Sequence, residues 1–231
     1  MTRLILFDID GTLVRTADAG RRALSRAFEE LFAVSNALDG VPIAGRTDSW
    51  IVADVAATRG LPCDVHTVER LRGAYLHYLP EELDEPGPRK GVMPGVRPLL
   101  EELSMRNDTY VALLTGNFEE GARLKLEYFD LWRYFRCGAF GDNAPERNGL
   151  LPRALARVRA CGGPSVEPGD VVIVGDTPLD VAVAVAGGTR SVAVATGGYD
   201  APTLHASGAD VVLDDLSDVP AVLDAMGLER T

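Results

Sequence analysis

Residues 4–14 read LILFDIDGTLV, and in this stretch four apolar residues lead directly into two acidic ones. Two interpretations of the acidic pair are open at this point. Asp10 and Gly11 between apolar runs are a good signal for a β-hairpin turn. Alternatively, the run is a buried strand that places Asp8 and Asp10 on the same side of its end. A nucleophile and an acid/base then face one substrate.

Similar short apolar runs recur along the chain, and helical patterns follow them. Continuous apolar runs that alternate with helices are typical of a parallel sheet covered on both faces. The sequence therefore predicts an α/β fold, a doubly wound parallel sheet, in which ligands bind beyond the carboxyl ends of the strands. The runs are LILF (4–7), YVALL (110–114), VVIV (171–174) and SVAVA (191–195), with weaker candidates near Cys137 and Val211.

Residues 16–88 interrupt this alternation. They contain three apolar patterns of helical spacing and no convincing strand. Residues 80–95 are rich in Pro and Gly and read as a returning linker. We expect an all-helical cap, residues 16–88, inserted into a catalytic core of residues 1–15 and 89–231. The patterns are Leu24, Ala27, Phe28, Leu31 and Phe32; Ile51, Val52, Val55 and Ala56; and Val68, Leu71, Tyr75, Leu76 and Leu79.

Composition and charge exclude several classes of protein. The net charge of −11 argues against a nucleic-acid partner, which clustered Lys and Arg would bind. Nothing approaches the roughly 18 consecutive apolar residues of a membrane span, and the N-terminal apolar run is too short for a signal peptide. Three scattered cysteines without a CxxC pair fit a reducing compartment. We expect a cytoplasmic protein without a membrane partner.

Thr115 follows a second apolar run, in VALLTGN (111–117). A helix cap is the ordinary explanation for such a threonine. In a functional site, its hydroxyl and the N–H groups of Gly116 and Asn117 supply donors for a phosphoryl oxygen at a helix N-terminus.

A third polar strand end is VVIVGDTPLDVAVA, residues 171–184. Thr177 as N-cap, Pro178 at the first helical position and Asp180 three residues after the cap explain most of it. Asp176 is left without a structural role. A carboxylate at the mouth of a buried strand is unfavourable unless it is paired or binds a metal, and Mg²⁺ suits carboxylate oxygens.

The order DxDGT, strand-Thr-Gly and strand-GDxxxD resembles the phosphatase branch of the haloacid dehalogenase-like superfamily, in its phosphoglycolate phosphatase-like subgroup with a helical cap. The likeness extends over nearly the whole chain. It implies a Mg²⁺-dependent phosphatase that hydrolyses a small phosphate monoester. Phosphoglycolate or a similar small phosphorylated metabolite is the leading substrate, and we expect a monomer or homodimer.

The resemblance also implies a role for each motif residue. Asp8 attacks phosphorus and forms an aspartyl-phosphate, while Asp10 protonates the leaving oxygen and later activates water. Thr115 and nearby N–H groups hold the phosphoryl oxygens. The implied Mg²⁺ ligands are the Asp8 carboxylate, the Asp10 backbone carbonyl and Asp176, with Asp180 in support.

The chain departs from the family pattern at one position, where the pattern has a Lys between the Thr and GDxxxD motifs. The only lysines are Lys90, in the linker, and Lys125, in a helix about two turns past the presumed site. We expect Arg147 to take this place, because its planar fork can hold a phosphoryl oxygen and a carboxylate together. Arg153 is the alternative, and a solvated surface Arg147 is the ordinary interpretation.

The cap offers one candidate substrate loop, GRTD at residues 45–48, before a predicted helix. Arg46 and Thr47 are expected to reach a substrate carboxylate, hydroxyl or second phosphate. The ordinary interpretation is a solvated Arg46, with Thr47 capping the helix.

The residues also distinguish this function from others in the superfamily and in other folds. A C–Cl dehalogenase does not need Asp10, and a phosphonate hydrolase uses a cap lysine that residues 16–89 lack. A sugar phosphomutase uses the same two acids and stays open as the alternative. A signalling receiver lacks DxDGT and the helical insert. A non-catalytic phosphate-binding protein is the remaining rival.

Overall fold

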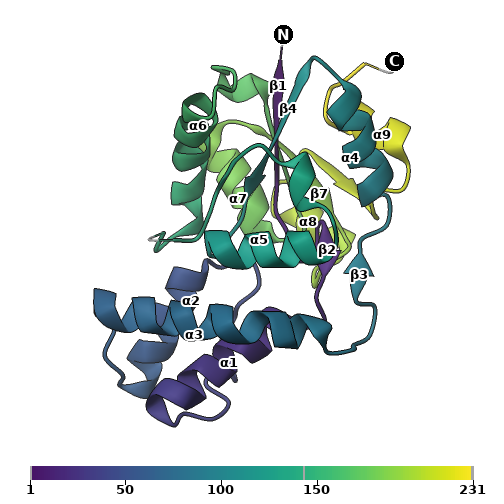
Figure 1. The fold of residues 1–231 in the computed structure, drawn as a ribbon. Helices are drawn as coiled ribbons and strands as arrows, with labels where there is room; N and C mark the ends of the chain where they lie inside the picture. The colour runs from purple at the N-terminus through teal and green to yellow at the C-terminus, as the bar shows by residue number, and fades with distance from the viewer. Residues whose placement is uncertain (1, 143, 230–231) are drawn as a thin grey trace.

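The computed structural model describes residues 2–142 and 144–229 and is built around one parallel sheet (Figure 1). Its six strands lie in the order β5-β4-β1-β6-β7-β8. The first strand is therefore central, with parallel partners on both sides. The strands are β1 (Arg3–Phe7), β4 (Thr109–Leu114), β5 (Gly138–Ala139), β6 (Val171–Gly175), β7 (Arg190–Val194) and β8 (Val211–Leu213).

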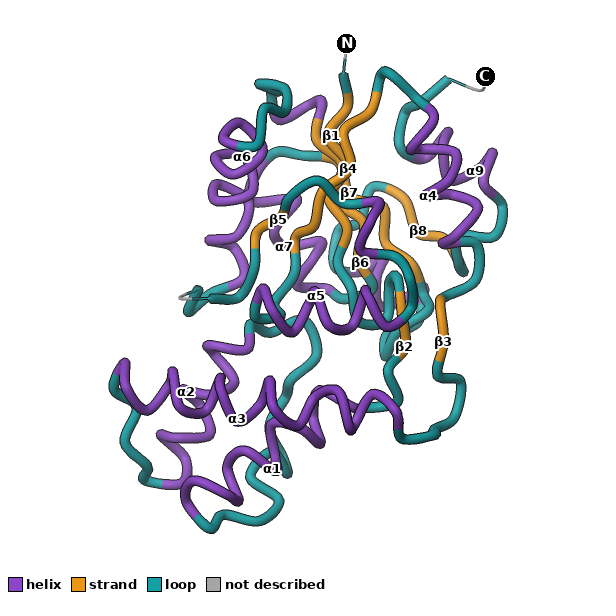
Figure 2. Tube along the Cα trace, viewed as in Figure 1, coloured by secondary structure: helices purple, strands orange, loops and turns teal. Residues whose placement is uncertain are grey.

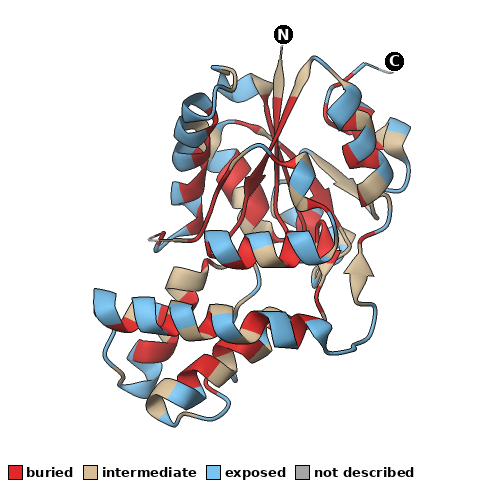
Figure 3. Cartoon of the chain, viewed as in Figure 1, coloured by how far each residue is buried: buried red, intermediate tan, exposed pale blue. Residues whose placement is uncertain are grey.

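Helices cover both faces of this sheet, which confirms the predicted doubly wound α/β fold (Figure 1). Alternate residues of β1 point to opposite faces, so Ile5 and Phe7 lie in one hydrophobic cluster and Leu4 and Leu6 in the other. Helices α4 (Val96–Met105), α5 (Glu119–Tyr128) and α9 (Val219–Ala225) contribute to the first cluster, and α6 (Leu150–Ala160) and α7 (Pro178–Gly187) to the second. The buried residues follow the sheet through the centre of the core (Figure 3).

The four strong apolar runs of the sequence are all strands, and the two weak candidates are the short edge strands β5 and β8. Because β1 is paired only in parallel, Asp10 and Gly11 do not form a hairpin between β1 and its neighbour. One element was not predicted. A two-stranded antiparallel ribbon is formed by β2 (Val14–Arg15) and β3 (Gly91–Val92). It lies where the chain leaves the core for the cap and where it returns.

Three helices lie together beyond the lower edge of the sheet, with no strand among them (Figure 2). They share a hydrophobic cluster in which Phe28, Val52 and Leu79 are buried, and Phe118 is its one buried member from outside residues 16–88 among the described residues. We infer from this separate core that residues 16–88 form the cap. The helices are α1 (Ala19–Phe32), α2 (Asp48–Arg59) and α3 (Val65–Asp84), and the remaining helix, α8 (Ala201–Ala206), packs on β7 and β8.

None of the described helices combines the length and the apolar character that a crossing of the bilayer requires.

Candidate active site

Asp8 directly follows β1 at the carboxyl edge of the sheet. Its backbone N–H donates to the carbonyl of Val174 at 2.9 Å, which continues the ladder between β1 and β6. The side chain is 5% exposed. Burial raises the pKa of Asp8 to about 6, although the neighbouring guanidinium of Arg147 acts in the opposite direction. This carboxylate is therefore largely shielded from solvent and has one cationic partner.

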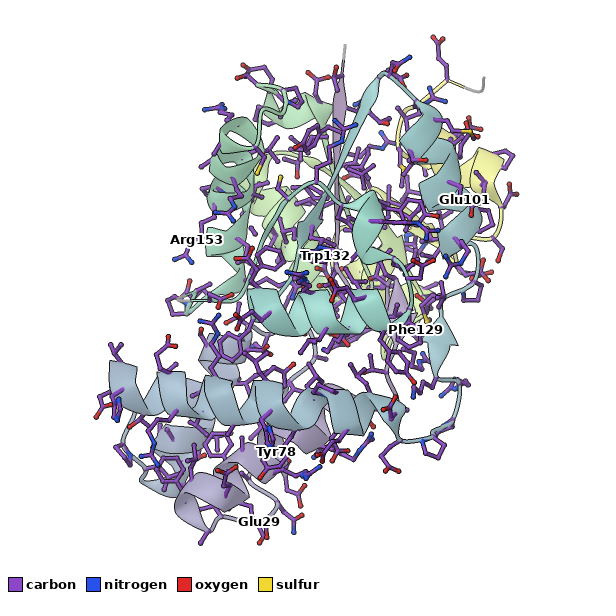
Figure 4. The ribbon with its side chains drawn as sticks, viewed as in Figure 1. Glu29, Tyr78, Glu101, Phe129, Trp132 and Arg153 are labelled. Carbon is purple, nitrogen blue, oxygen red and sulfur yellow. The ribbon has the colours of Figure 1, made fainter. Side chains whose placement is uncertain are left out.

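Arg147 is that partner, and it is buried at the start of the segment that leads into α6. Its Nη2 lies 2.8 Å from Oδ1 of Asp8 and 2.5 Å from Oδ1 of Asp180. Its Nη1 donates to the carbonyl of Gly45 in the cap at 2.9 Å. Arg153, the alternative, lies on the outer side of α6, where it donates to the carbonyl of Asp142 (Figure 4). The cation beside Asp8 is thus Arg147.

Three carboxylates gather at this edge of the sheet. Ligand atoms of Asp8, Asp176 and Asp180 lie within 4.8 Å of one another, and all three residues are buried. Burial, followed by repulsion from Asp8 and Asp180, raises the pKa of Asp176 well above its ordinary value. Arg147 supplies one positive charge against three negative ones when all are ionised. The cluster therefore has the excess negative charge and the oxygen ligands that suit a divalent cation.

Two glycines allow the backbone to approach Asp176. A Cβ on Gly11, whose φ is +86°, would lie 2.4 Å from Oδ2 of Asp176, and a Cβ on Gly197 would lie 1.6 Å from the same atom. Real side chains do not approach so closely. The only protein donor to the Asp176 carboxylate among residues 2–142 and 144–229 is the Thr12 hydroxyl, which binds Oδ1 at 3.0 Å. The two glycines therefore let the backbone pack closely on Oδ2, an oxygen to which no group donates among residues 2–142 and 144–229.

Asp180 is held differently, because protein groups bind both of its oxygens. Oδ1 accepts from Nε and Nη2 of Arg147. Oδ2 accepts from the N–H of Thr177 at 3.1 Å and from its hydroxyl at 2.7 Å. These contacts include the capping box that the sequence predicted at the start of α7. They suit an indirect contact to a metal better than direct ligation.

The phosphate-binding candidates follow β4. Thr115 is fully buried, and its hydroxyl accepts from the Asn117 amide at 2.8 Å. The carbonyl of Gly116 accepts a hydrogen bond from the N–H of Asp48 in the cap. Within the described residues, the Gly116 N–H has no protein acceptor. Because β1 and β4 are parallel neighbours and Phe7 pairs with Leu113, Thr115 lies one residue beyond the position opposite Asp8, at the same edge of the sheet.

The start of α2 fixes the cap against this edge. Thr47 caps α2 by accepting from the N–H of Trp50, and its hydroxyl donates to the carbonyl of Ala144 at 2.6 Å. Asp48 accepts from the N–H of Phe118 at 2.8 Å. Burial raises the pKa of Asp48 to about 6, while the Lys125 charge and this hydrogen bond oppose the shift. Thr47 therefore makes the helix-cap contact that was its ordinary interpretation, together with a contact that joins cap and core.

A cleft of about 490 Å³ lies between the cap and the sheet edge. Its core side includes Asp8, Asp10, Thr115, Gly116, Asn117, Arg147 and Asp176, and its cap side includes Gly20, Leu24, Arg46, Asp48 and Tyr75. The structure thus brings most predicted site residues to one space, while Thr47 and Asp180 stand behind it.

Lys125 also lines this cleft, although its place in the sequence, about two helical turns past Thr115, predicts a position remote from the site. Its side chain is 5% exposed, and Nζ lies 2.7 Å from Oδ2 of Asp10. One signal pointed to this position. Lys125 follows the buried Gly121 and Ala122 by four and three residues, so it shares the inward face of α5. A charge on an inward helix face needs a partner.

The haloacid dehalogenase-like hydrolase family matches residues 5–184. Phosphoglycolate phosphatase 1 of Pseudomonas aeruginosa is 31% identical over 226 residues, which cover 95% of this chain and 79% of the relative. Phosphoglycolate phosphatase of Rhodospirillum rubrum is 29% identical over 225 residues, with 95% and 90% covered.

The fold is also found in solved structures. CbbY from Rhodobacter sphaeroides, in complex with phosphate, has a TM-score of 0.75 at 22% identity, covering 97% of this chain and 100% of CbbY. A putative beta-phosphoglucomutase from Thermotoga maritima has a TM-score of 0.60 at 21% identity, with 96% and 99% covered. At these identities the likeness concerns the fold.

Proposed function

Since the chain belongs to the haloacid dehalogenase-like hydrolase family and is a phosphoric monoester hydrolase, we propose that it acts on small phosphate monoesters through an aspartyl-phosphate on Asp8. The observation that carries this proposal is the surrounding of Asp8. A buried carboxylate at a strand end has a guanidinium at 2.8 Å and two further buried carboxylates close by. That combination suits a nucleophile held beside a cation-binding site.

In the proposed reaction, an oxygen of Asp8 bonds to phosphorus as the bond from phosphorus to the ester oxygen breaks. Asp10 gives its proton to the departing oxygen. A water molecule then attacks phosphorus, Asp10 takes a proton from that water, and the bond from phosphorus to Asp8 breaks to release phosphate. Thr115 and the Gly116 N–H hold phosphoryl oxygens, and Arg147 offsets the negative charge. Positioning and charge neutralisation account for most catalysis of phosphoryl transfer.

A Mg²⁺ ion fits the donor set of this site. Asp8, the backbone carbonyl of Asp10 and Asp176 would hold it, with Asp180 in support because its own oxygens are already bound. Such an ion, when bound, neutralises negative charge that develops on the phosphoryl group. The features of this chain that support the assignment are the cluster of three buried carboxylates and Oδ2 of Asp176, to which no group donates among residues 2–142 and 144–229.

Metal removal is expected to abolish the activity reversibly. Without a cation, the negative charges of the three carboxylates repel an anionic ester. EDTA should therefore stop phosphate release, and excess Mg²⁺ should restore it. In the variant Asp176→Asn, which lacks one proposed ligand, the Mg²⁺ concentration that gives half-maximal rate is expected to rise. Full activity after EDTA treatment and exhaustive dialysis would contradict the proposed cation.

Arg46 supports a substrate that carries a second anionic group. Arg46 is one of the residues that line the cleft, and its guanidinium carbon lies 4.4 Å from the ring centroid of Trp50. It pairs with no acidic side chain among residues 2–142 and 144–229. Stacking on an aromatic ring orients a guanidinium without neutralising it. We therefore propose a small phosphate ester with a carboxylate, of which phosphoglycolate is the simplest example named among the relatives.

Purified protein with Mg²⁺ tests this proposal directly. Phosphate release is expected from phosphoglycolate with a higher kcat/KM than from ethyl phosphate, which lacks the carboxylate. Equal values for the two esters would remove Arg46 from the substrate site. Formation of an isomerised sugar phosphate, instead of free phosphate, would identify a phosphomutase. Absence of phosphate release from a panel of metabolite phosphates and aryl phosphates would contradict the phosphatase assignment.

A reducing cytoplasmic location is part of the proposal. Cys63, Cys137 and Cys161 are all free thiols, and Cys63 and Cys161 are exposed. Exposed free thiols persist where disulfide formation is disfavoured. Monomer or homodimer is the expected assembly.

A further inference from the structure

Asp10 is held by a closed ring of three hydrogen bonds at the mouth of the cleft. Its Oδ2 accepts from Nζ of Lys125 at 2.7 Å and from the Asn117 amide at 2.8 Å. The Asn117 carbonyl oxygen in turn accepts from Nζ of Lys125 at 2.6 Å. Each member therefore binds the other two. Such a ring fixes the position of the Asp10 carboxylate in a way that one ion pair on a flexible lysine does not.

The ring leaves one oxygen of Asp10 unbound. Both donors bind Oδ2, and within residues 2–142 and 144–229 no group donates to Oδ1. The Asp10 side chain is 40% exposed in the cleft, whereas the Lys125 side chain is 5% exposed. Lys125 thus approaches Asp10 from the protein side, and Oδ1 is the oxygen left for a proton transfer with substrate or water.

Stability alone does not account for a lysine at this place. Burial of an ammonium group costs several kcal/mol, and a buried ion pair is often no more stabilising than packed apolar side chains. The neighbouring positions on this face of α5, Ala122 and Leu126, are apolar and fully buried. An apolar residue at position 125 would extend that surface. The ion pair therefore points to a role in the site.

The cap leaves room for the ammonium group. Gly20 of α1 faces it, and a Cβ there would lie 3.2 Å from Nζ and 3.4 Å from Cε of Lys125. The same Cβ would lie 3.7 Å from the hydroxyl of Tyr75 on α3. Lys125 is therefore enclosed by two cap helices, with a glycine at the point of closest approach.

We propose that Lys125 is a positioning residue that, with Asn117, holds the Asp10 carboxylate so that Oδ1 serves the leaving oxygen. The inference rests on the acid role of Asp10 in the proposed function. Because Lys125 acts through Asp10, its removal should lower the rate most for esters whose leaving group needs a proton. The rate should fall least for esters whose leaving group does not.

Phenyl phosphate and 4-nitrophenyl phosphate separate these cases, because 4-nitrophenolate is the far weaker base and leaves without protonation. The value of kcat/KM reports the steps up to transfer of phosphorus to Asp8. Lys125→Met is expected to lower kcat/KM for phenyl phosphate at least about tenfold, a part of the 10²–10⁴ that a positioned acid contributes. For 4-nitrophenyl phosphate we expect a change within about threefold, with KM similar to wild type for both.

A double-mutant cycle tests whether Lys125 acts through Asp10. In an Asp10→Asn background, Lys125→Met is expected to cause no further loss on phenyl phosphate. Lys90→Met is the matched control, because Lys90 is the other lysine and lies in the returning linker, and it should keep wild-type rates. Gly20→Ala gives a second approach should Lys125→Met not fold. Alanine favours the helix, and its Cβ would lie 3.2 Å from Nζ, so Nζ must shift by a few tenths of an ångström and a smaller loss with the same dependence on the leaving group is expected.

The outcomes distinguish this inference from the proposed function. Equal losses on the two esters, or an undiminished loss in the Asp10→Asn background, would overturn the role of Lys125 while leaving the phosphatase intact. If Asp10→Asn itself lowered kcat/KM equally for the two esters, the acid role of Asp10 would be contradicted.

Discussion

Asp8→Asn is expected to lower kcat on an aryl phosphate by at least about 10³-fold, because removal of a catalytic nucleophile can cost up to about 10⁶-fold. The amide has nearly the same shape as the carboxylate but does not form the covalent phosphate intermediate. The substitution also removes one of the three buried carboxylates that repel one another. We therefore expect the variant to remain folded, and circular dichroism with thermal unfolding would check this.

The covalent intermediate gives the sharper measurement. Wild-type protein and Asp10→Asn, quenched in acid during turnover of 4-nitrophenyl phosphate, should each contain a phosphorylated species by mass spectrometry. The species should accumulate in Asp10→Asn, since activation of water is impaired, and should be missing in Asp8→Asn. Near-wild-type turnover by Asp8→Asn would show that another residue is the nucleophile.

The position of Asp8 could be predicted from the sequence because it depends on local pattern and on one topological rule. Residues 4–7 form a continuous apolar run, and in a parallel sheet such a run is buried with its carboxyl end at the ligand-binding edge. The same rule placed Thr115 and Asp176 beside Asp8, since β4 and β6 are the immediate neighbours of β1. Parallel register then converts positions far apart in sequence into one site.

Lys125 could not be placed in this way. About two turns of helix correspond to roughly 11 Å of rise, which suggests a residue remote from the strand end. Figure 1 shows the reason for the difference, because α5 lies across the carboxyl edge of the sheet, between the strands and α3, instead of leading away from it. That orientation is set by tertiary packing, including the close contact of Gly121 with Tyr75. Residue spacing contains no such information.

The contact of Thr47 with the core and the β2–β3 ribbon could not be predicted from the sequence, for a related reason. A helix cap at Thr47 follows from local chemistry and was anticipated, but its bond to the Ala144 carbonyl depends on how the cap sits on the core. The ribbon pairs residues 14–15 with 91–92, only two residues on each side. Pairing so short between such distant segments leaves no periodic pattern to detect.

Arg147→Ala is expected to affect activity and stability together. Loss of one charge-stabilising donor costs about 2–4 kcal/mol of transition-state stabilisation, which is about 30- to 1000-fold in kcat/KM. The same change leaves Asp8 and Asp180 buried without their guanidinium partner. Removal of one member of a buried ion pair typically costs about 3–5 kcal/mol of folding free energy. Urea unfolding alongside steady-state kinetics measures both effects.

Arg147→Lys separates charge from geometry. Lysine restores a positive charge, but as a point charge without the planar fork that reaches Asp8, Asp180 and the Gly45 carbonyl together. We expect it to recover part of the stability and less of the activity. Arg153→Ala is the matched control, since Arg153 lies on the outer side of α6 (Figure 4), and it should retain wild-type kinetics. A loss of activity in Arg153→Ala with none in Arg147→Ala would transfer the cationic role. Recovery of full activity in Arg147→Lys would mean that charge alone is required there and that the fork contributes only to the attachment between core and cap.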